Sequence, residues 1–163
     1  MKGKETLIAG FTGTTFMTLF SYLVSAIAKE NFSEPERLGQ LTHRLLPVLN
    51  KKESQLSGWA GHYGVGLAFA GAYVALWEKR KIEQSLKNDL LIGGISGIIA
   101  VGIWKTTFKL HPLPPRLSFD QYYVQLVPAH VVFAIFAGLG YRILKKHDQK
   151  RVEKELSDRR HIL

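Results

Sequence analysis

The chain has no cysteine among its 163 residues. That absence excludes disulfide bonds, thiol catalysis and metal sites made of thiolates. Acidic residues are also scarce, with 13 Asp and Glu against 22 Lys and Arg, and none lies in the four most apolar segments. Spans without carboxylates argue against an acid-based proton pump and against a di-iron bundle. The sequence also lacks a phosphate-binding glycine loop, an H-E-x-x-H zinc motif and a supported Ser-His-Asp arrangement.

Long apolar segments are present instead. Segments of about 20 residues with almost no charge match the thickness of a hydrocarbon core and predict transmembrane helices. We therefore expect an all-α integral membrane four-helix bundle within residues 1–144, followed by a charged cytoplasmic tail at 145–163. The expected spans are about 7–28, 58–77, 90–108 and 123–144.

The Lys and Arg residues behind the formal net charge of +9 are unevenly distributed among the segments that connect the expected spans. The N-terminus, the second connection and the chain from Arg142 onward hold 14 of the Lys and Arg residues, whereas the first connection holds five and the third holds three. Because positive residues concentrate on the cytoplasmic side of membrane proteins, both termini are expected there. The basic excess thus indicates a topology signal, and a nucleic-acid partner is not expected.

A cleaved signal peptide is the competing interpretation of the first segment. Lys2 and Lys4 precede an apolar run that ends in Ala26-Ile27-Ala28, which resembles a cleavage site. The run, however, is longer than the usual apolar part of a signal peptide, about 7–15 residues. It also matches an internal span, so we expect it to stay in the mature protein.

An internal repeat gives that match. Ile8-Ala9-Gly10-Phe11-Thr12-Gly13 resembles Ile92-Gly93-Gly94-Ile95-Ser96-Gly97, 84 residues later. His62 and Tyr73 likewise correspond to His130 and Tyr141, 68 residues later. The pattern predicts two repeated helical hairpins related by a pseudo-twofold axis along the membrane normal. Pairs of small residues four apart, such as Gly93 and Gly97, predict close helix packing.

The first connection carries a helix signal of its own. Ser33 and Glu36 have the spacing of a capping box, with Pro35 in the first turn. The leucines that follow, at 38, 41, 45 and 49, form one apolar stripe. This pattern predicts an interfacial helix in the first outer loop.

A polar site is expected under the outer loops. His62 and His130 lie within the second and fourth predicted spans, where an ionisable side chain is costly and indicates function. The candidate ligand-binding residues are His62, His130, Lys105, His111, Asp120 and Tyr63. The structural interpretation stays open, because the aromatic residues can form an interfacial belt, Lys105 can snorkel outward and buried histidines can simply hydrogen-bond.

One stretch resembles a known family. Trp104, His111-Pro112, the proline-rich turn to Pro115, Asp120 and Ala129 to Phe133 resemble the YagU-like family of small four-helix bacterial inner-membrane proteins of unknown function. The resemblance covers mainly residues 58–142. It implies the four-helix fold and a bacterial inner-membrane location, and it supplies no catalytic mechanism. Lys105 and the long basic tail are not features of that family pattern.

Three function classes follow. The first is binding of a lipid, quinone, haem or proton-coupled solute near His62 and His130, since two histidines on facing helices can ligate a b-type haem. The second is a structural or accessory subunit, packing as a homo-oligomer or against a membrane protein partner. The third is an enzyme that acts on a lipid headgroup through His130, His62, Lys105 and Asp120. No catalytic residue is assigned, and the metal is unknown.

Overall fold

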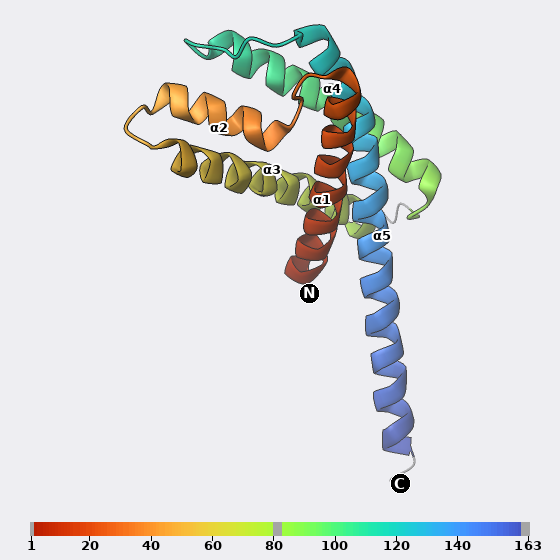
Figure 1. The fold of residues 1–163 in the computed structure, drawn as a ribbon. Helices are drawn as coiled ribbons and strands as arrows, with labels where there is room; N and C mark the ends of the chain where they lie inside the picture. Colours follow the sequence, from red (N-terminus) through yellow and green to blue (C-terminus); the bar gives the residue numbers. More distant parts are fainter. Residues whose placement is uncertain (1, 80–82, 161–163) are drawn as a thin grey trace.

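A computed structural model describes residues 2–79 and 83–160. The described chain is all helical, as expected (Figure 1). Its five helices are α1 (Lys2–Ala28), α2 (Glu34–Leu45), α3 (Lys51–Lys79), α4 (Leu86–Leu110) and α5 (Phe119–Arg160). No break separates residue 144 from the residues that follow, because α5 continues to Arg160.

The expected four-helix bundle is wrong. The described residues form five helices, and only three of these are long and apolar enough to cross a membrane: Gly3–Ala28, Leu86–Leu110 and Phe119–Asp158. Helix α3 has the length, but its glycines, His62 and its tyrosines lower its mean hydropathy. The three helices are compatible with a membrane protein. Helices α1 and α4 also expose large apolar side chains, such as Leu23 and Ile98, and this exposure is likewise compatible with a membrane protein.

Helices α1 and α5 lie side by side and run in opposite directions (Figure 1). Helices α2 and α3 form an antiparallel hairpin that projects from this pair, and α4 packs across α5. Helix α2 is therefore not isolated at an interface: it packs along α3 and buries Glu34, Pro35 and Leu41. The last turns of α5 extend beyond the other helices in Figure 1.

Local hydrogen bonds fix where the helices begin. Ser33 is the N-cap of α2, but its side chain caps nothing, so the expected capping box with Glu36 is not formed. A reciprocal capping box instead starts α3. The Glu53 N–H donates to Asn50 Oδ1 at 3.0 Å, and the Asn50 N–H donates to Glu53 Oε2 at 2.8 Å.

Glycines allow the closest helix contacts. A Cβ at Gly58 of α3 would overlap the backbone of Pro35 and Gly39 in α2. A Cβ at Gly97 of α4 would lie 2.6 Å from the Cα of Val127 in α5. Small residues thus mark the places where helix backbones touch. In a lipid bilayer, where the hydrophobic effect does not drive helices together, they associate through such close van der Waals contacts.

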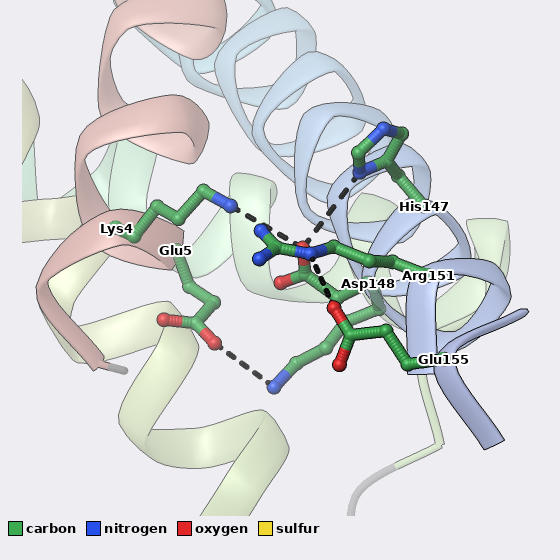
Figure 2. Close-up of polar contacts among 7 residues, drawn as sticks. Lys4, Glu5, His147, Asp148, Arg151 and Glu155 are labelled. Carbon is green, nitrogen blue, oxygen red and sulfur yellow. Dashed lines mark hydrogen bonds and ion pairs between the residues drawn. The ribbon is translucent and has the colours of Figure 1, made fainter. Parts of the chain in front are cut away.

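Ion pairs gather at one end of the molecule (Figure 2). Lys4 pairs with Asp148 at 3.2 Å, and Lys145 pairs with Glu5 at 3.1 Å and with Glu78 at 2.9 Å. These pairs tie the start of α1 and the end of α3 to α5.

A further pair adds the start of α4 to the same end. Arg142 of α5 lies 3.0 Å from Asp89, near the N-terminus of α4. Helices α1 and α4 therefore begin at this end, hereafter the ion-pair end, and α3 and α5 both run toward it. Glu5 and Asp89 are also 84 residues apart, the offset of the glycine-rich repeat.

Candidate functional site

A cavity of about 100 Å³ lies where all five helices meet. Its walls are mainly apolar, and its polar lining consists of a few side chains. The lining includes Thr14 and Met17 of α1, Glu34 and Leu38 of α2, His62 and Phe69 of α3, Trp104 and Thr107 of α4, and His130 and Phe133 of α5. Val65 and Ile103 also line it and are about half exposed, so the cavity opens between α3 and α4.

His62 is buried, with 6% of its surface exposed, and its Nε2 lies 2.9 Å from Thr18 Oγ1. The Thr18 hydroxyl already donates to the Thr14 carbonyl at 2.8 Å. It must therefore accept from His62, so the neutral imidazole carries its proton on Nε2. The other ring nitrogen, Nδ1, is then a hydrogen-bond acceptor.

His130 of α5 is equally buried, with 5% of its surface exposed. Its Nδ1 lies 2.9 Å from the Leu126 carbonyl oxygen, one helical turn earlier. A carbonyl only accepts, so Nδ1 carries the proton and Nε2 is the acceptor of the neutral ring. Each neutral ring thus keeps one acceptor nitrogen, and both histidines line the cavity.

Glu34 is the charged group at this cavity, and the sequence analysis did not single it out. Its side chain is almost fully buried. Oε1 accepts from Ser21 Oγ at 3.0 Å and from Gln125 Nε2 at 3.2 Å. Among the described residues, Oε2 has no hydrogen-bond partner. Burial raises the pKa of Glu34 to about 7, because the neutral acid is easier to bury than the carboxylate.

The turn after α1 places Glu34 against the other helices. Lys29 adopts a left-handed conformation, with φ of 54°, and ends α1. The Phe32 N–H then donates to Ser25 Oγ at 2.8 Å, which folds the chain back along α1. The first turn of α2 therefore faces Ser21. In the sequence, Glu34 looked like an ordinary acidic residue at a helix start, a position usually exposed to solvent.

A second residue of the cavity lining has a buried polar atom without a hydrogen-bond partner among the described residues. Thr14 lines the cavity, and its Oγ1 is buried without a hydrogen bond among the described residues. Gly66 of α3 makes room for it, since a Cβ there would overlap Oγ1. Buried polar groups are normally satisfied by protein, water or ligand. Two residues of the cavity lining thus each have a buried polar atom left for water or a ligand to satisfy, and the carboxylate oxygen of Glu34 requires a hydrogen-bond donor.

Of the six predicted site residues, the structure brings two together. His62 and His130 line the same cavity. Lys105 is exposed, with Nζ 5.3 Å from the ring centroid of Tyr123. Asp120 is also exposed, in the first turn of α5, and neither residue lines the cavity.

The remaining two residues make contacts elsewhere. The Tyr63 hydroxyl lies 3.0 Å from Thr15 Oγ1, and its ring packs against Phe11. His111 ends α4: its Nδ1 accepts from the Leu113 N–H at 3.1 Å, so its Nε2 donates to the Leu41 carbonyl at 3.0 Å. His111 thus joins the proline-rich loop to α2.

The geometry does not suit the metal and haem options. Within residues 2–79 and 83–160, no three His, Asp or Glu side chains are grouped so as to hold a metal ion. Drug-sized ligands occupy pockets of about 300–1,000 Å³, so a cavity of about 100 Å³ is too small for a haem. A small solute or a few water molecules fit its size.

Comparisons with protein-family models, curated proteins and solved structures found no match to this chain. The resemblance to the YagU-like family therefore stays a prediction. The candidate site rests on the geometry of Glu34, His62 and His130.

Proposed function

We propose that this protein is a membrane protein that binds a small hydrogen-bond donor, such as a primary ammonium group, in the cavity. The observation that carries the proposal is the buried, unpartnered Oε2 of Glu34 at a cavity also lined by His62 and His130. The carboxylate of Glu34 accepts hydrogen bonds when it is ionised, and the neutral imidazoles of His62 and His130 each keep an acceptor nitrogen. A ligand rich in N–H or O–H groups complements such a lining.

The cavity walls favour a ligand with a short apolar part. Phe69, Phe133 and Trp104 surround the polar groups, and apolar walls with a few placed polar groups are typical of small-molecule sites. A short alkylammonium has both parts. Its ammonium would pair with Glu34, and its methylene groups would contact the aromatic rings. Among the solutes considered from the sequence, a proton-coupled one fits best, because Glu34 titrates near neutral pH.

The location proposed is the bacterial inner membrane, with the ion-pair end in the cytoplasm. Lys4 and Asp148 lie at the same end of the molecule, so α1 begins and α5 leaves on one side. The concentration of Lys and Arg near both chain ends supports the cytoplasmic side.

Ligand binding is expected to depend on pH and on Glu34. At pH 8, ethylammonium should raise the melting temperature of the detergent-solubilised protein and shift its tryptophan fluorescence, because Trp104 lines the cavity. At pH 5.5 the effect should largely disappear, because Glu34, with a pKa of about 7, is then protonated and carries no charge. The Glu34→Gln variant should lose the response at both pH values.

Matched controls separate this site from general salt effects. Tetramethylammonium has the same charge but no N–H donor, so it should give no shift. Asp120→Asn removes an exposed carboxylate outside the cavity and should respond like the natural chain. An equal response in Glu34→Gln, or to tetramethylammonium, would refute the proposal. The protein would then fit the structural-subunit class better.

The side of each chain end is expected to be measurable without removing native thiols, since the chain has no cysteine. Single variants Ser118→Cys and Lys154→Cys would be treated in spheroplasts with a membrane-impermeant maleimide. Ser118→Cys should label in intact spheroplasts, and Lys154→Cys only after permeabilisation. Labelling of both from the outside would contradict the proposed orientation.

A further inference from the structure

A second cleft lies between α2 and the proline-rich loop at residues 112–116, with a volume of about 580 Å³. It is separate from the cavity around Glu34: the two have no lining residue in common. Its polar lining consists of Arg37, Gln40, Arg44 and Arg116. No carboxylate from the described residues lines it, so three guanidinium groups face one cleft without a negative charge among them.

Neutral acceptors hold two of these arginines in place. Arg37 donates through Nε to the Asn31 carbonyl at 3.0 Å and through Nη1 to Gln40 Oε1 at 2.9 Å. Arg44 donates through Nη1 to the carbonyls of Leu113 and Pro114, at 3.1 and 2.7 Å. Because a guanidinium has five N–H donors, each of these side chains keeps donors for a further acceptor.

The charge of Arg37 is compensated only at a distance, by Glu30 and Glu36. The residue is only 7% exposed, and burying a cation without a directly paired counter-charge is costly. In the described part of the chain, none of the three arginines forms an ion pair with a carboxylate. A bound anion would supply that charge. Phosphate suits it, because its oxygens accept paired hydrogen bonds from planar guanidinium groups.

Apolar residues beside the cleft indicate what carries the phosphate. Leu45 and Leu46 follow Arg44 directly, and Leu113 lies on the loop; each of the three is roughly half exposed. Exposed apolar side chains next to a cationic cleft complement an amphiphile that has an anionic headgroup and acyl chains. A free phosphate ion would leave these leucines without a contact.

We propose that this cleft binds the phosphate group of a phospholipid, whose acyl chains lie against the neighbouring leucines. Arg116 and Arg44 contact the phosphate from the loop and from the end of α2, and Arg37 supplies the buried charge. The lipid thereby bridges α2 and the loop that precedes α5. This site is independent of ligand binding in the cavity.

Native mass spectrometry of the full chain in detergent tests the proposal. The probes are dioctanoyl phosphatidic acid, dioctanoylglycerol, which lacks only the phosphate, and inorganic phosphate. Phosphatidic acid should bind and dioctanoylglycerol should not. The double variant Arg44→Gln, Arg116→Gln should weaken phosphatidic acid binding about tenfold or more, since a charge-assisted hydrogen bond contributes about 1.5–3 kcal/mol.

Lys109→Gln is the control, because it removes an exposed positive charge near the end of α4 that does not line the cleft. It should bind phosphatidic acid as the natural chain does. Equal weakening by Lys109→Gln, or equal binding of dioctanoylglycerol, would overturn the site. Displacement of the lipid by equimolar inorganic phosphate would overturn the lipid as its occupant. The ethylammonium response of the double variant should be unchanged, which keeps this test distinct from that of the cavity.

Discussion

Replacing Arg142 by leucine is expected to lower the free energy of unfolding by about 3 kcal/mol, because it leaves the buried carboxylate of Asp89 without its counter-charge. Asp89 is fully buried, and its side-chain Oδ2 accepts a hydrogen bond from Arg142 Nη1 at 3.0 Å. Its other oxygen, Oδ1, has no partner in the described part of the chain. The measurement is unfolding of the purified protein in mixed detergent, compared with the natural chain.

Two variants test whether the effect comes from the buried charge. Arg151→Leu removes an exposed pair with Glu155 on the same helix (Figure 2), and it should cost at most about 0.5 kcal/mol. The double variant Asp89→Leu, Arg142→Leu should recover much of the lost stability, because no charge is then left buried. A loss in Arg142→Leu no larger than in Arg151→Leu would contradict this role for Asp89.

Replacing Gly58 by alanine is expected to cost up to about 3 kcal/mol, the upper end of what overpacking usually costs. The added Cβ would overlap backbone atoms of Pro35 and Gly39, which cannot rotate away as a side chain can. Helix α2 would have to move off α3 and carry Glu34 with it. The same variant should therefore also weaken the ethylammonium response.

Gly64→Ala provides the matched control on the same helix. Nothing lies within 4 Å of the position where its Cβ would be. Because alanine has a higher helix propensity than glycine, this variant should leave the free energy of unfolding unchanged or raise it by up to about 1 kcal/mol. Thermal unfolding of both variants decides the matter: equal stabilities would show that the contact between α2 and α3 tolerates an extra carbon.

The helical content and most helix positions could be predicted from the sequence, because hydrophobic segregation and helix signals are local. The near absence of charge predicted a span at residues 58–77, yet Lys51–Lys79 is not among the described helices apolar enough to cross a membrane, because its glycines, His62 and its tyrosines lower its mean hydropathy. The capping box was predicted at Ser33 and forms at Asn50. Both positions have the required spacing, but Glu36 accepts hydrogen bonds from Tyr22 and Asn31 instead of the Ser33 backbone.

The candidate site was predictable only in part. His62 and His130 stood out because an ionisable residue is unusual in an apolar segment. Glu34 did not, because its burial depends on contacts with Ser21 and Gln125, the latter 91 residues away. Glu5 and Asp89 were missed for the same reason: each is adjacent to an apolar segment, and its counter-charge lies on α5. Sequence periodicity shows which residues share a face, but not which helix covers that face.

The position of the ion-pair end has a consequence for the order in which the chain assembles. The carboxylates of Glu5, Glu78 and Asp89 belong to helices made early in synthesis, whereas Arg142 and Lys145 are made last. Until α5 has been synthesised, these three carboxylates lack their ion-pair partners Arg142 and Lys145. Helices α1, α2 and α3 can pack against one another before that point, but the ion pairs that join α1, α3 and α4 to α5 can form only after Arg142 and Lys145 have been made.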